Sequence, residues 1–319
     1  MINLDMQTIK TIILIFLFFL FKEITYSQKP NAFIVEDVGL GKKGHSISTS
    51  SKFAPFPDTG RAKGHDYNGQ YFDFENHYND SSVLIYVPQK FNLTKPLELV
   101  LWFHGWNNNI DSAGTFFRLI EQFEHSGRNA IFIFPEGPKN APDSYGGKFE
   151  RPEIFLLFIK DMLRQLVLFN ILPQKKKVEI NDCSISLSGH SGAYRIISKI
   201  IQYNKVDEVI LFDAMYGSNE VYLKWIAETD VHRFIHIYTK DGGTFENTHL
   251  IMNYLKDSLN VHYISVNERE VNPTLLRSSN RLFIYSDKAH NEVITNSDNN
   301  NWQRFLKYRK NKFIRKIIT

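Results

Sequence analysis

Short runs of consecutive apolar residues alternate along most of the chain with longer stretches in which apolar residues recur every three or four positions. The short runs predict strands that are buried on both faces, and the longer stretches predict amphipathic helices. Strands are expected at residues 82–88, 97–103, 130–135, 180–187, 208–212, 234–238, 262–266 and 282–285. This alternation predicts an α/β fold with a mainly parallel central sheet flanked by helices.

The helical pattern covers residues 112–125, 152–168, 194–203, 220–228 and 246–259, and a basic amphipathic helix is expected over residues 302–318. Residues 136–151 are polar and rich in Gly and Pro, which predicts a loop. No internal repeat or linker divides the chain. We therefore expect a single main domain over residues 80–319.

The N-terminus carries the pattern of a secretory signal peptide. Lys10 precedes an unbroken apolar run from Ile12 to Phe21, and polar residues with a small Ser27 follow. An apolar run of about ten residues is short for a membrane span. We expect residues 1–27 to be a signal peptide cleaved after Ser27, and the mature protein to be secreted or periplasmic without a stable membrane anchor. An uncleaved signal anchor is the alternative.

Residues 28–79 show weak periodicity between the predicted signal peptide and the main domain. Gly, Ser and Lys are frequent in residues 28–65, and aromatic and acidic residues mix in residues 67–78. This composition predicts an extended N-terminal segment that packs on the domain.

The composition indicates a folded protein that does not bind nucleic acid. Hydrophobic residues make up 43% of the chain, which is enough apolar material for a large core. The net charge of +4 is mild, and the 38 basic and 34 acidic residues are interleaved. Cys183 is the only cysteine, so no intramolecular disulfide is possible, and we expect it to be a small buried core residue.

One segment has the layout of a nucleophile elbow. The apolar run that ends at Leu187 meets the small-residue turn Gly189-His190-Ser191-Gly192-Ala193, and a helical pattern follows at once. Such a turn holds its serine in a strained backbone conformation, so the residues two before and two after must be small. Gly189 and Ala193 meet this requirement, although glycine is usual at both places.

The order of these parts resembles the α/β-hydrolase superfamily over roughly residues 80–319. The resemblance rests on His104-Gly105 after an early strand, on the elbow at Ser191, on an acid after a later strand, and on a histidine near the C-terminus. It implies a serine hydrolase of α/β-hydrolase fold that forms a covalent acyl-enzyme without a cofactor. These motifs do not select one subfamily.

The resemblance implies a catalytic triad in which Ser191 is the nucleophile and His290 is the base. Two acids are candidates. Asp213 follows directly on an apolar strand, whereas Asp241 lies in a Lys-Asp-Gly-Gly turn, where aspartate has an ordinary structural role. We favour Asp213 and keep Asp241 as the alternative acid.

The resemblance also implies an oxyanion hole made of two backbone N–H groups. One is that of Gly192, directly after the nucleophile, and the other comes from Trp106 or Gly105 in the turn after His104. The Trp106 side chain is alternatively a lid or a substrate contact. The run 107–109, three consecutive asparagines, is expected to be a solvated turn at the edge of the site.

Metal and nucleotide sites are not indicated. His65, Asp66 and His77 lie in the N-terminal region without paired ligand spacing, which argues against a zinc site. Phosphate-binding and dinucleotide-binding fingerprints are absent from the sequence. We expect no cofactor and no metal.

The superfamily hosts many activities, and the fold alone does not select one of them. Hydrolysis of a carboxyl ester is therefore predicted as the default reaction. The aromatic residues in 67–78 and the loop 137–149 suggest, by analogy, a small-molecule or glycan ester, including a carbohydrate or cell-wall component. An amidase or peptidase would use the same triad. A non-catalytic binding protein that retains the fold is the alternative from another class. The sequence does not predict the oligomeric state.

Overall fold

The computed structural model describes residues 33–35, 44–174 and 179–309. All of these belong to one compact unit, Ala32–Thr319. The predicted signal peptide, residues 1–27, lies outside the described residues, so its cleavage stays a prediction. Within the described ranges, no helix has both the length and the apolar character that a membrane span requires.

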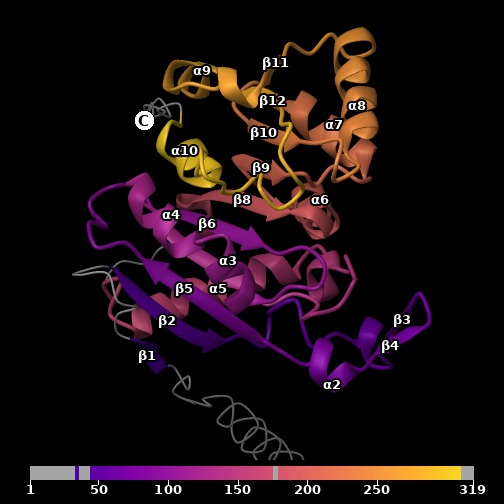
Figure 1. Ribbon diagram of the computed structural model, residues 1–319. Helices are drawn as coiled ribbons and strands as arrows, with labels where there is room; N and C mark the ends of the chain where they lie inside the picture. Colours follow the sequence, from indigo (N-terminus) through magenta and orange to yellow (C-terminus); the bar gives the residue numbers. More distant parts are fainter. Residues whose placement is uncertain (1–32, 36–43, 175–178, 310–319) are drawn as a thin grey trace, which may run out of the picture. The chain divides into compact units, whose positions relative to one another are not determined.

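Ten strands form one central sheet in the order β1-β2-β5-β7-β6-β8-β9-β10-β12-β11 (Figure 1). All pairs from β7 across to β11 are parallel, and β1, β2, β5 and β7 pair antiparallel with one another in turn. The predicted mainly parallel sheet is therefore confirmed. The strands are β1 Phe33–Val35, β2 His45–Ser50, β5 Ser82–Val87, β6 Glu98–Phe103, β7 Ile131–Pro135, β8 Ser184–His190, β9 Glu208–Phe212, β10 Arg233–Tyr238, β11 Ile264–Asn267 and β12 Arg281–Tyr285.

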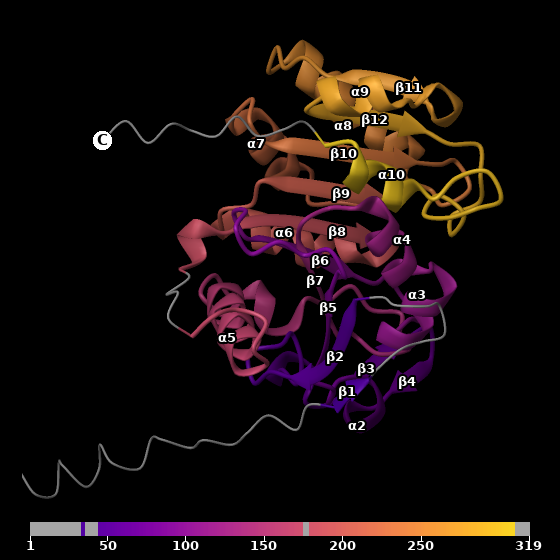
Figure 2. The same cartoon turned by 90° about the vertical axis from the view of Figure 1, so that its left-hand side faces the viewer.

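Helices cover both faces of the sheet, and Figure 2 shows α5 and α6 on one side of it with α3 and α4 on the other. Side chains that alternate along β6 enter two separate cores: Leu99 and Leu101 join one, and Val100 and Trp102 join the other. The first core includes residues of α5 to α8, and the second includes residues of α3, α4, α9 and α10. The helices are α3 Ile110–Phe116, α4 Leu119–Ser126, α5 Ile154–Leu168, α6 Tyr194–Tyr203, α7 Asn219–Glu228, α8 Phe245–Asp257, α9 Pro273–Ser278 and α10 Asn301–Lys307.

Part of the predicted N-terminal segment belongs to the sheet. Strand β2 pairs antiparallel with β5 along its whole length. A separate hairpin of β3 (His65–Tyr67) and β4 (Gln70–Phe72) follows, and then the short helix α2 (Phe74–His77). Phe56 and Tyr78 pack with Ala141 in a small third core. The polar composition of this segment hid its strand from the sequence pattern.

The predicted helix over residues 112–125 is wrong in one respect, because the structure has two helices, α3 and α4. Arg118 lies between them in the left-handed region, with φ of 52°. Ala113 and Phe117 point into the core from one helix, and Leu119 and Phe123 do so from the next. Residues two apart cannot share one face of a continuous helix, so the chain must break between Phe117 and Leu119.

The boundaries of two other elements also differ from the prediction. The elbow strand begins at Ser184, because Ile180–Asp182 form a 3₁₀ turn in which the Asp182 side chain accepts a hydrogen bond from the Glu179 N–H. The last helix ends at Lys307 rather than continuing to residue 318, and the non-helical residues Tyr308 and Arg309 follow it. Residues 310–319 lie outside the described residues.

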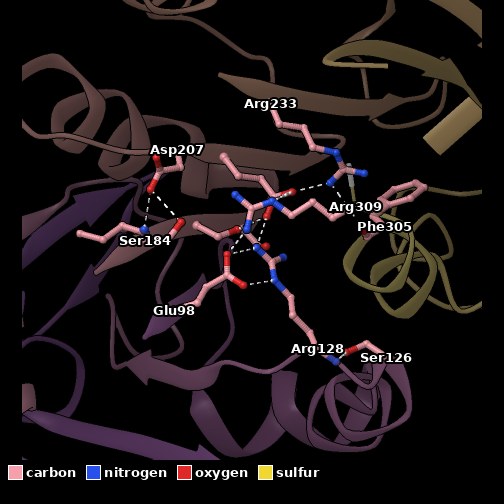
Figure 3. Close-up of polar contacts among 12 residues, drawn as sticks. Glu98, Ser126, Arg128, Ser184, Asp207, Arg233, Phe305 and Arg309 are labelled. Carbon is pink, nitrogen blue, oxygen red and sulfur yellow. Dashed lines mark hydrogen bonds and ion pairs between the residues drawn. The ribbon is translucent and has the colours of Figure 1, made fainter. Parts of the chain in front are cut away.

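A cluster of buried charges lies where strands β6, β9 and β10 begin (Figure 3). Arg128 bridges Glu98 and Glu208 at 2.8 and 2.6 Å, Arg233 pairs with Glu208, and Arg309 pairs with Glu98. Burial opposes ionisation of Glu208, but the neighbouring arginines outweigh it and lower its pKa to about 2. The cluster therefore holds the end of α10 against the sheet. It lies at the amino ends of the parallel strands, whereas the candidate site lies at their carboxyl ends.

Candidate active site

Strand β8 ends in a sharp turn that carries Ser191. Ser191 has a φ of 55°, a strained value for a residue with a side chain, and a 3₁₀ turn (Ser191–Ala193) leads directly into α6. A Cβ atom added to Gly189 would come within 2.7 Å of the Ala193 methyl group, and Ala193 itself is buried in the core. The Ala193 methyl therefore packs into the space that Gly189 leaves open, which explains why alanine is tolerated here.

The turn after β6 lies directly against Ser191. A Cβ atom on Gly105 would come within 2.7 Å of the Ser191 Cβ and 3.4 Å of the Gly192 nitrogen. Gly105 therefore has to be glycine for the two turns to meet. The His104 ring is buried and bonds to Glu136 at 3.0 Å, so His104 holds the turn in place and does not reach the serine.

Trp106 lies over Gly192, the residue that follows Ser191. A Cβ atom on Gly192 would come within 2.5 Å of Trp106 Cδ1, and the indole N–H donates to Ser144 Oγ at 2.7 Å. The three asparagines of residues 107–109 have structural roles. Asn107 has a φ of 53° and donates its backbone N–H to the Ala141 carbonyl, and Asn109 caps α3.

His290 lies in the loop after β12 and contacts Asp213 at the end of β9. The Nδ1 atom of His290 is 2.7 Å from Asp213 Oδ2, and the Asp213 carboxylate is fully buried. An ionised carboxylate only accepts hydrogen bonds, so the His290 Nδ1–H donates to Asp213. The structure thus brings together the predicted base and the favoured acid.

Asp213 is held by several donors besides His290. Its Oδ1 accepts the Thr239 N–H at 3.1 Å and the Thr244 hydroxyl, and its Oδ2 accepts the Thr239 hydroxyl at 2.7 Å. Burial alone would raise the pKa of Asp213, but the hydrogen bonds from His290, Thr244 and Thr239 outweigh burial and lower it. The carboxylate is therefore ionised and fixed in orientation.

The alternative acid, Asp241, contacts a different part of His290. Its Oδ2 accepts the His290 backbone N–H at 2.9 Å. Asp241 is exposed to solvent, unlike Asp213. The structure therefore gives the two acids separate positions: Asp213 meets the imidazole, and Asp241 anchors the loop that carries it.

Gly242 is a site residue that sequence reasoning missed. A Cβ atom at this position would collide with Asp213 Oδ2 and His290 Nδ1. Its backbone N–H donates to the Thr239 hydroxyl at 2.7 Å, the same hydroxyl that donates to Asp213. The Lys-Asp-Gly-Gly turn after a strand was the available signal, but a glycine required for a turn and one required for a close approach look alike in sequence.

His190, which precedes Ser191, packs on the ring of His290. The two ring centroids are 4.4 Å apart, and His190 Nε2 lies 3.1 Å from the His290 carbonyl oxygen. Burial, together with the nearby His290, lowers the pKa of His190 to about 3. His190 is thus a neutral donor that positions the loop around His290.

Tyr216 was also missed, and it packs beside His290. Its hydroxyl donates to the Gly242 carbonyl. Its ring centroid is 6.4 Å from that of His290 in an edge-on arrangement. Tyr216 follows the strand that ends at Asp213, and a tyrosine in a loop carries no signal of its own.

The histidines considered for a metal both lie in the N-terminal segment. His65 is on β3, and His77 Nδ1 lies 2.7 Å from the Lys139 carbonyl oxygen. In the described ranges, no group of three or more His, Cys, Asp or Glu side chains is placed to hold a metal ion.

Comparisons with known proteins bear on the fold. No family model and no curated protein sequence matches the chain. Among solved structures, a feruloyl esterase module from Clostridium thermocellum complexed with sinapinate has a TM-score of 0.51 at 10% identity, over 84% of this chain and 89% of that one. An S-formylglutathione hydrolase from Staphylococcus aureus has a TM-score of 0.47 at 13% identity, over 83% of this chain and 98% of that one.

The likeness to the feruloyl esterase module extends over most of both chains and agrees with the mainly parallel sheet and its two helical layers. The nucleophile-elbow geometry at Ser191 agrees with it independently. This chain has the α/β-hydrolase fold.

Proposed function

We propose that the protein is a serine hydrolase in which Ser191 is the nucleophile, His290 the general base and Asp213 the orienting acid. The observation that carries this proposal is the 2.7 Å contact between His290 Nδ1 and Asp213 Oδ2. That pair lies beside an elbow serine with a φ of 55°, at the carboxyl ends of neighbouring parallel strands. Ligands of α/β sheets bind at this edge.

In the proposed reaction, Ser191 Oγ attacks the carbonyl carbon of an ester while its proton passes to His290 Nε2. The Ser191 hydroxyl turns to His290 when substrate is present, since catalytic hydrogen bonds often tighten only in the substrate complex. Asp213 stabilises the imidazolium that forms. The alcohol leaves with the proton from His290, and water then releases the acid from the acyl-enzyme by the same steps.

The oxyanion of the tetrahedral intermediate would lie near the junction of the two turns at Gly105 and Gly192. Gly192 is the second residue of a helical turn, and the first N–H groups of a helix have no partner inside it. The second donor would be the backbone N–H of Trp106 or Gly105. Each such donor contributes on the order of a hundredfold in rate.

We propose a carboxyl ester as the substrate. Exposed aromatic side chains border the site. Trp106, Tyr216 and Tyr67 are 41%, 40% and 36% exposed. The feruloyl esterase module, which has the same fold, was solved in complex with sinapinate. A panel of alkyl, aryl and sugar esters, with matched amides, tests this proposal. Hydrolysis that disappears in Ser191→Ala would support it, and amide turnover that exceeds ester turnover would redirect it to an amidase.

We also propose that the protein is exported. The support is the pattern Lys10, apolar run and small Ser27 at the N-terminus. Expression of the full chain in a secreting bacterial host, followed by intact mass measurement of each fraction, tests this. We expect the mass of a mature chain that begins at Gln28. An intact chain held in the membrane fraction would identify a signal anchor instead.

A further inference from the structure

Trp106 is the exception among the four tryptophans of the chain. Trp102, Trp225 and Trp302 are at most 4% exposed, whereas Trp106 is 41% exposed. A single exposed apolar side chain is ordinary on a folded surface, but Trp106 packs against a second exposed aromatic residue, Tyr67. Trp106 also lies against Gly192, directly after the proposed nucleophile.

The Trp106 side chain is held in place from two sides. Its indole N–H donates to Ser144 Oγ at 2.7 Å, and the Gly192 backbone lies against its Cδ1–Nε1 edge. On the side of the hairpin, the Tyr67 ring meets it at a centroid distance of 5.1 Å and an interplanar angle of 73°. An exposed side chain that is already fixed loses little conformational entropy when a ligand binds to it.

The loop that supplies Ser144 is itself anchored. Arg61 forms a bidentate pair with Asp143, at 2.6 and 3.1 Å, and Asp143 also accepts the Tyr145 N–H at 2.9 Å. The Tyr145 hydroxyl donates to Asp58 at 2.7 Å. These buried or half-buried contacts fix the residues on both sides of Ser144, so Ser144 is a stable partner for the indole.

We infer that Trp106 and Tyr67 form a binding surface for a six-membered ring in the substrate, and that Trp106 determines specificity for ring-bearing esters. The inference rests on the proposed function, because the surface borders Gly192 and Ser191. An aryl ring and the apolar C–H face of a pyranose both stack on tryptophan, and the shared chemistry is a six-membered ring with a weakly polar face. Trp106 acts here through binding and not through proton transfer.

The first test compares esters that share one acyl group. Benzyl acetate and methyl 6-O-acetylglucopyranoside carry rings, and butyl acetate does not. The quantity compared is kcat/KM for a ring ester divided by kcat/KM for butyl acetate. We expect this ratio to fall about tenfold or more in Trp106→Ala. In Trp106→Phe we expect most of the ratio to be kept. The two ring esters separate an aryl from a sugar ligand. An unchanged ratio in Trp106→Ala for both ring esters would overturn the inference.

Tyr203→Ala is the matched control, because Tyr203 is another exposed aromatic residue, 50% exposed. It is the last residue of α6, about 15 Å along the helix from the elbow. The ester ratio should not change in this variant. A fall equal to that of Trp106→Ala would mean that loss of exposed aromatic surface in general, and not this site, lowers the ratio.

The second test reads binding without catalysis. In the full-length Ser191→Ala protein, methyl glucopyranoside or benzyl alcohol should protect the exposed tryptophan from acrylamide quenching, whereas glycerol and butanol should not. Trp106→Phe in the same background should abolish the protection. If the ring compounds protect the tryptophan but Ser191 of the wild-type protein proves unreactive, the hydrolase proposal is refuted and the ring site is kept. Absence of protection by both ring compounds would overturn the ring site alone.

Discussion

A side chain at position 242 would collide with the carboxylate of Asp213, because the Gly242 backbone lies directly against Asp213 Oδ2 and His290 Nδ1. The pairing of the acid with the imidazole thus depends on a residue that has no side chain. The turn after β10 therefore packs directly against the Asp213–His290 contact.

Gly242→Ala should therefore lower kcat by about a hundredfold or more, because the new methyl group separates Asp213 from His290. The loss should appear in kcat/KM for every ester, with the chain still folded. Gly114→Ala is the control, since a Cβ at Gly114 in α3 has no neighbour within 4 Å. That variant should keep full activity. An active Gly242→Ala enzyme would show that the acid–imidazole contact is dispensable.

Substitution of the two acids should separate their roles. Asp213→Asn should reduce kcat about 10³- to 10⁴-fold, because an amide cannot stabilise the imidazolium and can favour the wrong tautomer of His290. Asp241→Asn should cost far less, because the amide oxygen can still accept the His290 backbone N–H. Steady-state kinetics with one ester decide between them, and the reverse order of effects would make Asp241 the triad acid.

Buried His190 should make stability depend on pH. Its pKa, about 3, is below the ordinary value near 6.5, so between these pH values the unfolded chain binds a proton that the folded chain does not. Stability is therefore full above about pH 6.5 and falls as the pH is lowered, by about 2 kcal/mol between pH 6.5 and 5 from this group. Urea unfolding of the wild-type protein and of His190→Gln measures it. Equal slopes against pH in the two proteins would contradict the buried, neutral assignment.

The buried carboxylate of Glu208 should be important for stability. Glu208→Gln leaves Arg128 and Arg233 short of a counter-charge, and breaking a buried ion pair costs about 3–5 kcal/mol. Thermal unfolding should show a lower midpoint, with an unchanged KM in the protein that remains folded. Asp298→Asn, which removes a surface pair with Lys288, is the control and should shift the midpoint little. A Glu208→Gln protein as stable as this control would contradict the account of the charge cluster.

The sequence pattern was sufficient for the sheet because its parallel strands are almost wholly apolar, and short apolar runs between helical stretches are typical of strands buried on both faces. It placed Ser191, Asp213 and His290 at the ends of strands, and the parallel sheet then necessarily brings those ends to one edge. The strand at 45–50 escaped prediction because its sequence, His-Ser-Ile-Ser-Thr-Ser, is mostly polar and resembles a loop.

The contacts within the site could not be predicted in the same way. Whether Asp213 or Asp241 meets the imidazole depends on the path of the loop after β12, which sequence does not specify. The roles of Gly242, Tyr216 and Ser144 arise from close approaches between segments that lie far apart in the chain. Periodicity reports which side of an element is buried, but it does not report which loops meet.

The most direct test of the central claim is covalent labelling of the purified protein with a fluorophosphonate probe, with the modified residue located by peptide mass spectrometry. The account predicts one label per chain, on Ser191, and loss of labelling in Ser191→Ala and His290→Ala proteins that remain folded. A folded wild-type protein that does not react, or that reacts at another residue, would contradict the assignment of Ser191 as the nucleophile.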